Sequence, residues 1–451
     1  MIFGRDIGGE RGFAFIMSGP VHELAEKLNG VLQADGSPLY RFLSAKGQRA
    51  FFPSTGILGQ GAQAKGAAIN ATIGTAFEED GTPLSLECAE RLTALPSTAF
   101  LYSPSSGVAA LRDIWREMLF EKNPSLKGKR FSHPVVTHAL THGLFVAGHL
   151  FVGEDDAVIL PNLYWDNYEL LFCEGYGAKL DLFPMFTAAG AFNAAAMEAK
   201  LMEPGERKLL LLNFPNNPTG YTATESDAVA ITASIRRAAE AGKKVVVILD
   251  DAYFGLVYEE GVCRESLFVQ LADLHPNVLA VKLDGATKED YVWGIRVGFI
   301  TFASKGATDE QYRALEAKAA GTVRGTVSNC SNIGQQMMLN IYRDPDYMTQ
   351  KREKYAILNR RYQTIKRELA AHPEYAESFT RMPSNSGYFM CVKPIGVEAE
   401  AVRRCLIERF STGVIVLNGL IRLAFSSVPN AALPTLFANI DAAVRYLKER
   451  A

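Results

Sequence analysis

Two stretches of the chain carry side chains that could do chemistry together. Residues 245–249 are aliphatic and β-branched, which predicts a strand buried on both faces, and this run ends at Asp250 with Tyr253 close behind. Another apolar run, residues 278–281, comes shortly before Lys288. Ligands usually bind at the carboxyl ends of parallel strands. A carboxylate, a phenol and an amine gathered there favour a lysine that forms a Schiff base with an aldehyde cofactor, whose pyridinium nitrogen the carboxylate keeps protonated.

The elements that must position these side chains are strands alternating with helices from about residue 100 onward. Residues 135–137, 157–161 and 209–214 have the apolar character of buried strands, with helical patterns between them. Thr224 and Asp227 predict a capping box at the start of one helix, and Gly242 predicts its end. This alternation predicts an α/β fold with a doubly wound, mostly parallel sheet.

The pattern changes after about residue 345, where a long charged helical stretch leads into short strands and two further helices. This order is typical of a smaller α+β domain. We therefore expect an N-terminal arm with part of the small domain over 1–95, a large cofactor-binding domain over 96–345, and a C-terminal small domain over 346–451.

Composition narrows the classes of partner. The chain has 451 residues, and its 47 lysines and arginines nearly balance 49 aspartates and glutamates, so neither a nucleic acid nor an acidic membrane is expected as a partner. The six cysteines have no CxxC spacing, and residues 1–6 show no signal-peptide pattern. No apolar run approaches the ~20 residues that span a bilayer. We expect a cytoplasmic protein.

A dinucleotide-binding fingerprint is one alternative. Gly59, Gly61 and Ala64 have its spacing, and Glu78 follows at roughly the expected distance of ~20 residues. The motif requires a strand directly before the glycines, and residues 51–56 do not have the pattern of a strand. We interpret this stretch as a flexible loop.

A zinc site is a second alternative, since His138 and His142 stand four residues apart on a predicted helix. The pair lacks the intervening glutamate of the zinc motif. We therefore expect no metal.

Several motifs occur in an order that resembles fold type I pyridoxal-phosphate (PLP) enzymes, nearest the aspartate/aromatic aminotransferase branch. Asn217 begins an Asn-Pro-Thr-Gly loop, Asp250 and Tyr253 form a D-x-x-Y motif, and Lys288 precedes Arg296 of a Gly-x-Arg-x-Gly motif by eight residues. The resemblance extends from about residue 69 to residue 425.

The resemblance implies a role for each of these side chains. Lys288 would be the Schiff-base lysine and proton shuttle, and Asp250 would hold the pyridine nitrogen protonated. Asn217 and Tyr253 would bind the phenolic oxygen of PLP, and Arg296 would grip its phosphate.

Other segments resemble further parts of the PLP site. Trp165 corresponds to the aromatic residue that stacks on the cofactor ring. Ala139, Leu140 and Thr141 fall where the phosphate loop meets a helix N-terminus. Tyr102 resembles the tyrosine that reaches the phosphate of the neighbouring subunit. The resemblance therefore implies a homodimer with shared active sites.

The substrate side of the site is also implied by the resemblance. Arg422 matches the arginine that clamps the α-carboxylate, and Gly74 matches a glycine beside that carboxylate. Arg324, five residues before Asn329, matches the clamp for a distal carboxylate contributed by the partner subunit. Trp165 and Asn217 would also contact substrate.

The implied activity is transamination between an L-amino acid, aspartate or aromatic, and a 2-oxo acid. Alternatives are another reaction on the same scaffold, such as a C–S β-lyase or an amino acid decarboxylase. A PLP-binding regulator fused to a DNA-binding domain is disfavoured, because the first ~100 residues are neither basic nor helix-turn-helix-like.

Two positions depart from the family pattern. Gly285 stands where a phosphate-binding serine is usual, and Thr287 or a main-chain donor could replace that serine. Cys330 and Ser331 stand where prolines normally follow the Ser-Asn pair.

Overall fold

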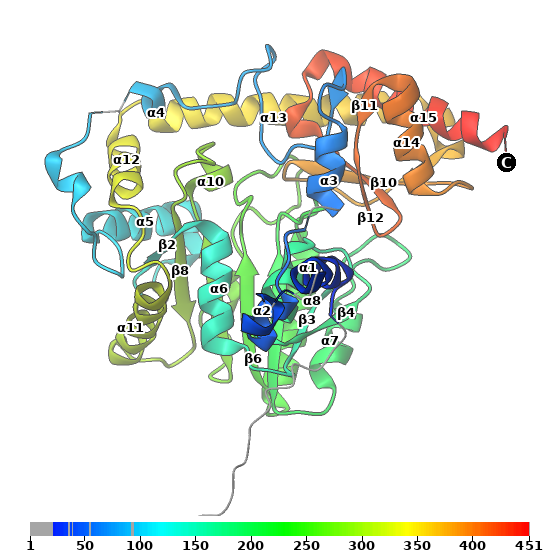
Figure 1. The fold of residues 1–451 in the computed structure, drawn as a ribbon. Coiled ribbons are helices and arrows are strands. Elements are labelled where there is room, and N and C mark those ends of the chain that lie inside the picture. The colour runs from blue at the N-terminus through cyan, green and yellow to red at the C-terminus, as the bar shows by residue number, and fades with distance from the viewer. Residues whose placement is uncertain (1–20, 35–36, 38, 54–55, 92–93, 451) are drawn as a thin grey trace, which may run out of the picture.

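The computed structural model describes residues 21–34, 37, 39–53, 56–91 and 94–450. Within this part, a seven-stranded sheet forms the centre of the molecule, in the order β2-β8-β7-β6-β5-β3-β4 (Figure 1). The strands β3 to β7 pair in parallel, whereas β8 runs antiparallel to both of its neighbours. The bounds are β2 Val135–Thr137, β3 Ala157–Pro161, β4 Lys179–Phe183, β5 Arg207–Asn213, β6 Lys244–Asp250, β7 Val278–Asp284 and β8 Gly298–Ala303.

Burial of the central strands explains why their sequences are continuously apolar. Both β5 and β6 are buried at every position after the first residue, because helices pack against the sheet and leave its middle no solvent-facing side. The packing helices include α5 (Ala109–Lys122), α6 (Ala139–Phe151), α7 (Ala194–Met202), α8 (Glu225–Glu240), α9 (Phe268–Leu271) and α11 (Asp309–Thr326). The predicted α/β class with a mostly parallel sheet is confirmed.

The predicted start and the predicted end of the helix that precedes β6 are also confirmed. Thr224 caps α8, and Asp227 bonds back to the Thr224 main chain, so the capping box is present. The helix ends at Glu240, and Gly242 has φ +89°, a left-handed conformation that favours glycine.

A second, four-stranded antiparallel sheet has the order β12-β13-β10-β9. The helix α13 (Tyr347–Ala371) runs along the top of Figure 1, from above the central sheet toward this second sheet. The other elements here are β9 Phe379–Arg381, β10 Phe389–Pro394, α14 Ala399–Phe410, β12 Ile415–Leu417, β13 Leu420–Ala424 and α15 Leu433–Lys448. Two residues of the N-terminal part, β1 (Ile69–Asn70), pair with β11 (Thr412–Gly413). The boundaries of the predicted domains stay a prediction.

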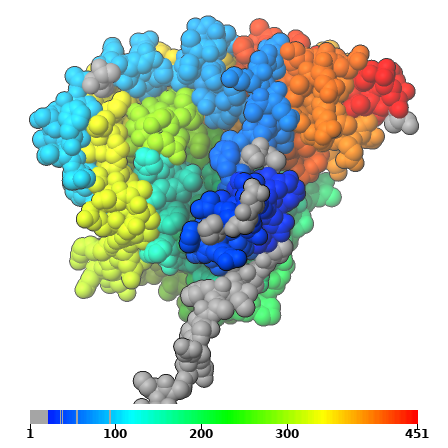
Figure 2. Space-filling model, viewed as in Figure 1, coloured from blue at the N-terminus to red at the C-terminus, as the bar shows by residue number. Residues whose placement is uncertain are grey.

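The N-terminal part begins with α1 (Glu23–Gln33) and α2 (Ala45–Arg49), which lie on the outside of the molecule below α3 (Gly56–Gln63) (Figure 2). The prediction of a flexible loop is wrong from residue 56 onward, because this stretch forms the helix α3. Ser54 and Thr55, which belong to the same predicted loop, lie outside the described residues. Gln60 explains the difference, since its side chain donates to the Val416 carbonyl at 3.0 Å and accepts from the Val416 N–H at 2.6 Å. Such tertiary bonds override the low helix propensity of glycine.

No strand precedes the glycines of α3 in the described residues 50–53, so the dinucleotide motif lacks its required context. Residues 1–6, which show no signal-peptide pattern, lie outside the described part. Across the described ranges, every helix is too short or too polar to cross a membrane.

Candidate active site

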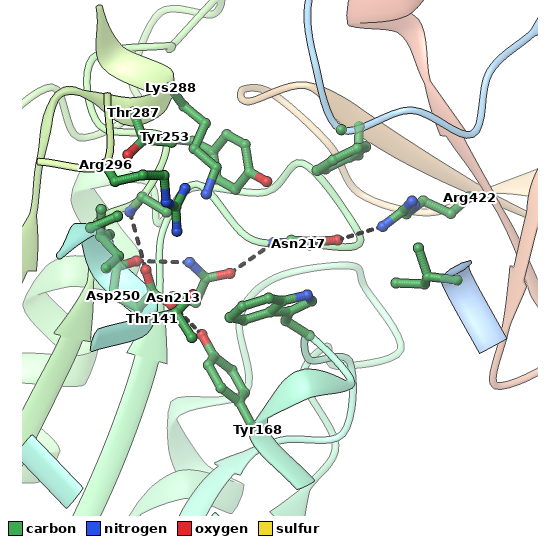
Figure 3. A pocket seen from close by; sticks show the side chains of 17 residues that line it. Thr141, Tyr168, Asn213, Asn217, Asp250, Tyr253, Thr287, Lys288, Arg296 and Arg422 are labelled. Carbon is green, nitrogen blue, oxygen red and sulfur yellow. Dashed lines mark hydrogen bonds between the residues drawn. The ribbon is translucent and has the colours of Figure 1, made fainter. Parts of the chain in front are cut away.

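A cavity of about 170 Å³ opens beyond the carboxyl ends of the central strands, between the two sheets (Figure 3). Most of the residues predicted for the site line it, although the chain separates them widely. The structure brings together Gly74, Ala139, Leu140, Thr141, Trp165, Asn217, Asp250, Tyr253, Lys288, Arg296 and Arg422.

Asp250 is the last residue of β6 and is 3% exposed. The Tyr168 hydroxyl donates to its Oδ2 at 2.6 Å, and the Ala252 N–H donates to its Oδ1 at 3.2 Å. Burial raises the pKa of Asp250, while the Tyr168 hydrogen bond and the Lys288 charge lower it. Burial has the largest effect and raises the pKa of Asp250 overall, so its charged form depends on these two partners and not on water.

Tyr168 is a site residue that the sequence reasoning missed. It stands three residues after Trp165, and the two rings meet edge to face with centroids 5.6 Å apart. Residues three apart in a helical turn share a side, so this spacing could have drawn attention to Tyr168.

Lys288 lies in the short helix α10 (Ala286–Glu289), which follows β7. Its Nζ is 5.2 Å from the centre of the Tyr253 ring, and its carbonyl accepts a hydrogen bond from the Tyr388 hydroxyl at 3.1 Å. Burial lowers the pKa of Lys288, and the nearby Asp250 carboxylate opposes that change. A lowered pKa increases the fraction of neutral amine, the form that acts as nucleophile or base.

The two residues after Lys288 are buried acids held by lysines from other helices. The Lys122 Nζ lies 3.0 Å from Glu289 Oε1, and the Lys351 Nζ lies 2.8 Å from both Glu289 Oε1 and Asp290 Oδ1. Burial alone would raise the pKa of Glu289, but Lys122 and Lys351 together lower it to about 2. This group, which we call the lysine clamp, anchors the segment that carries Lys288.

The side of the cavity that holds Lys288 can also receive an anion. Arg296 is half-buried, with φ +60°, and donates to the Trp293 carbonyl at 3.3 Å. The Thr287 hydroxyl is buried and has no hydrogen-bond partner among the described residues. The first turn of α6, with Thr141, lines the same region, and helix N-termini favour anions.

Packing accounts for the glycine at position 285. A Cβ there would lie 2.6 Å from the Gly298 Cα and 2.8 Å from the Val297 carbonyl oxygen, so a serine does not fit. The nearby hydroxyl of Thr287 is the available substitute.

The other departure, at Cys330 and Ser331, is explained by hydrogen bonds. The Cys330 carbonyl accepts from the Ser103 hydroxyl at 2.9 Å, and the Ser331 hydroxyl caps α12 (Asn332–Arg343) by accepting from the Gly334 N–H at 3.2 Å. Polar contacts thus hold the loop without prolines.

Arg422 projects from β13 into the cavity and is 2% exposed. It donates to Asn217 Oδ1 at 3.1 Å and to the Thr72 carbonyl at 3.2 Å, while its Nε is buried without a partner among the described residues. The guanidinium also lies 4.5 Å from the centre of the Phe389 ring. Burial lowers the pKa of Arg422. A buried cation with an unused donor is suited to a ligand carboxylate.

Two predicted site residues lie outside this cavity. Tyr102 is 91% exposed, and Arg324 is exposed on α11, where it donates to the Ser328 hydroxyl at 2.7 Å. The sequence reasoning assigned both of them to the site of a neighbouring subunit, and that assignment stays a prediction.

The histidine pair considered for zinc is engaged in ordinary contacts. His142 Nδ1 accepts from the His138 N–H at 3.0 Å, and its Nε2 lies 2.9 Å from the Thr326 hydroxyl. Burial lowers the pKa of His142 to about 4. In the part of the chain that the structure describes, no three His, Cys, Asp or Glu side chains group as metal ligands.

The donor set fits PLP. The cavity offers an amine for the aldehyde at Lys288, a buried carboxylate for the ring nitrogen at Asp250, and a cation with a hydroxyl for the phosphate at Arg296 and Thr287. The unpartnered Thr287 hydroxyl is the kind of buried polar atom that a bound phosphate would satisfy.

Comparisons with known proteins agree with this chemistry. Residues 77–440 match the model of the family "Aminotransferase class I and II". A probable aspartate/prephenate aminotransferase from Aquifex aeolicus is 26% identical over 60% of this chain and 64% of its own length. An aspartate aminotransferase from Bacillus subtilis is 23% identical over 65% of this chain and 66% of its own length. The chain thus spans about two thirds of the length of these relatives.

Solved structures show the same fold. An aminotransferase from Anaerococcus prevotii has a TM-score of 0.78 at 22% identity and covers 89% of this chain and 98% of its own. A mitochondrial aspartate aminotransferase from Trypanosoma brucei has a TM-score of 0.71 at 21% identity, and the match covers 85% of this chain and 99% of that one. The resemblance inferred from the motifs is confirmed: the chain belongs to the aminotransferase class I and II family.

Proposed function

We propose that this protein is a PLP-dependent aminotransferase that moves an amino group between an L-amino acid, aspartate or aromatic, and a 2-oxo acid. The supporting observation is one buried cavity that gathers the Lys288 amine, the Asp250 carboxylate and the guanidinium groups of Arg296 and Arg422. The aminotransferase names of the Aquifex aeolicus and Bacillus subtilis relatives point to the same reaction.

PLP, when bound, supplies an aldehyde that condenses with amines and a ring that takes up electrons from a breaking Cα–H bond. Asp250 would keep a proton on the ring nitrogen, and the hydrogen bond from Tyr168 favours the ionised form of Asp250 that this task needs. Asn217 and Tyr253 would hold the phenolic oxygen, Trp165 would pack on the ring, and Arg296, Thr287 and the first turn of α6 would hold the phosphate.

The amino acid is oriented by its α-carboxylate, which pairs with Arg422 beside Gly74. With PLP bound, the Lys288 amine would be the base that takes the proton from the substrate Cα and holds it during the transfer. Burial lowers the pKa of this amine and so increases the fraction of its neutral form, which is the form that acts as a base.

The test is Lys288→Ala in the purified protein. We expect loss of the visible absorbance that a lysine-bound PLP gives, together with loss of turnover, while Arg422→Ala retains the absorbance and loses affinity for substrate. Transamination at the wild-type rate by Lys288→Ala would contradict the assignment.

Product analysis separates transfer from elimination or decarboxylation on the same scaffold. With L-aspartate and 2-oxoglutarate present, transfer yields glutamate and a new 2-oxo acid. Ammonia or carbon dioxide, released without glutamate, would instead indicate a lyase or a decarboxylase.

The proposal includes a cytoplasmic homodimer with shared active sites. Tyr102 and Arg324 support it, since both are exposed and lie away from the cavity of their own subunit. Sedimentation of the purified protein tests the dimer. Mixing Lys288→Ala with Arg324→Ala subunits tests the sharing, because a mixed dimer regains one complete site.

A further inference from the structure

A second group of buried charges lies behind the strand ends that carry the active site. It consists of Asp251, Lys282 and Asp284, which we call the Lys282 cluster, and Lys282 and Asp284 are 0% exposed. Lys282 is the register partner of Leu249, the residue before Asp250, and successive residues of a strand point to opposite faces. Lys282 and Asp284 therefore lie on the face of the sheet opposite Asp250, which lines the cavity.

The Lys282 ammonium holds two carboxylates at once. It donates a hydrogen bond to Asp251 Oδ2, and its Nζ lies 3.3 Å from Asp284 Oδ2. The Ser266 hydroxyl donates to the same Asp251 oxygen at 2.6 Å, and the Trp115 Nε1–H donates to Asp284 Oδ1 at 3.1 Å. Burial alone would lower the pKa of Lys282, but Asp251 and Asp284 raise it above its usual range. The lysine therefore stays charged, although it has no contact with water.

The Lys282 cluster joins the ends of the two strands that carry the proposed cofactor groups. Asp251 directly follows Asp250 at the end of β6, and Asp284 is the last residue of β7, four residues before Lys288. The Asp251 main-chain N–H also donates to the Leu283 carbonyl at 2.9 Å, so the two chain segments stay paired at this point. On the other face, the side chains of Asp250 and Lys288 both line the cavity (Figure 3). A shift of either strand end would thus change the distance between these two side chains.

Stability alone does not account for a charged residue at position 282. The neighbouring buried residues of β7, Ala280, Val281 and Leu283, are apolar. Apolar side chains of similar volume are often as stabilising as a buried ion pair. An ammonium differs from them because its hydrogen bonds are directional and hold their acceptors at defined positions.

We infer that Lys282 is a positioning residue for the proposed transamination, and that it holds Asp250 and Lys288 at the separation that one cofactor requires. Lys282 itself is not among the residues that line the cavity, so it acts through the two strand ends. The inference rests on the proposed function, because that function assigns Asp250 and Lys288 to the same cofactor.

The test is Lys282→Met, with Lys208→Met as the matched control. Lys208 is another buried lysine of the central sheet, but it lies at the amino end of β5, where it donates to the Pro204 carbonyl at 3.1 Å. We expect Lys282→Met to weaken PLP affinity in equilibrium dialysis by roughly tenfold. With L-aspartate and 2-oxoglutarate, kcat should fall by at least roughly tenfold, while KM changes by less than about threefold. Lys208→Met should keep the wild-type PLP affinity and kcat.

Lys282→Met leaves two buried carboxylates without their cation, so the same measurements are made on Lys282→Met/Asp251→Asn, which removes one charge of each sign. We expect this double variant to unfold at a higher urea concentration than the single variant and to keep the low PLP affinity and the low kcat, because the link between the strand ends is still absent. Wild-type PLP affinity or wild-type kcat in either Lys282 variant, or equal losses in Lys208→Met, would overturn the inference. If the wild-type protein binds PLP but does not transaminate, the proposed function fails instead, and the PLP affinities still decide the role of Lys282.

Discussion

Replacing Lys351 by methionine tests how the segment that carries Lys288 is held. Lys351 projects from α13 to the carboxylates of Glu289 and Asp290, which are 3% and 0% exposed. Asp290 also accepts hydrogen bonds from the Tyr342 and Tyr347 hydroxyls, at 2.9 and 2.7 Å. Methionine keeps most of the apolar volume of lysine and removes the charge, so the change isolates the ionic contribution.

The pKa shift of Glu289 gives the scale of the expected loss of stability, and the general cost of breaking a buried ion pair gives its size for one lysine. The pKa of Glu289 is about 2, against an ordinary value of 4.5, and this shift corresponds to about 3 kcal/mol of unfolding free energy near neutral pH that Lys122 and Lys351 supply together. Removal of one partner from a buried ion pair generally costs ~3–5 kcal/mol, because the other charge stays buried. We therefore expect Lys351→Met to lose about 3 kcal/mol.

Urea unfolding at pH 7 measures this loss, with Lys366→Met as the control on the same helix. Lys366 pairs with Glu259 at 3.0 Å but is 42% exposed, so its loss should cost less than ~1 kcal/mol. The double variant Lys351→Met/Asp290→Asn removes one buried charge of each sign and should recover part of the stability. Equal stability of Lys351→Met and Lys366→Met would refute the reasoning.

The sign of the pH dependence provides a second check on the lysine clamp. Because the folded pKa of Glu289 is depressed, its stabilisation is present above pH 4.5 and is lost as the pH falls toward 2. Lys351→Met should show a smaller loss over that range than the wild type. Its kcat should fall more than its KM rises, since the clamp contacts the segment of Lys288 and not the substrate.

Three further substitutions test single contacts in the site. Tyr168→Phe removes a hydrogen bond to a buried carboxylate, which is worth about 1.5–3 kcal/mol. The pKa of Asp250 should therefore rise, and the acid limb of the kcat/KM profile should move up by about one to two pH units. The control Tyr176→Phe loses only a hydrogen bond to a main-chain carbonyl at 2.8 Å, so it should leave that limb in place. Gly285→Ser should reduce stability by about 1–3 kcal/mol through overpacking against Gly298, without tightening PLP binding in equilibrium dialysis. Thr287→Val keeps the shape and should weaken PLP affinity by roughly tenfold, and unchanged affinity would contradict a phosphate contact.

The sequence predicted β2, β3, β5, β6 and β7 of the large sheet, though not β4 or β8, and the residues at their carboxyl ends, because both signals are local. Aliphatic runs such as residues 245–249 indicate buried strands, and the polar residues that follow them must meet at one edge of a parallel sheet. That logic predicts that Asp250 and Lys288 share one cavity, and both residues line the same cavity in the structure. Arg422 was predicted from the family resemblance, and its place within an apolar strand agrees with that role because a buried arginine requires a partner.

The missed features depend on contacts between distant segments. Nothing near α3 in the sequence indicates that Gln60 will bond to Val416, so two glycines suggested a loop where a helix forms. The lysine clamp joins Lys122, Glu289 and Lys351, which lie on three separate helices. A lone lysine in a charged helix resembles a surface residue, and only tertiary packing shows that it is buried.

One chain of hydrogen bonds explains why the two sheets form a single site. Arg422 on β13 donates to Asn217, whose main-chain N–H donates to Asn213 Oδ1 at 2.8 Å, and Asn213 Nδ2 donates to the Asp250 carbonyl at 2.7 Å (Figure 3). The proposed clamp for the substrate carboxylate and the proposed partner of the cofactor ring are thus connected through two asparagines. Substitution of Asn217 would disturb Arg422 and its alignment with Asp250 together, so its effects on substrate affinity and on turnover should not be separable.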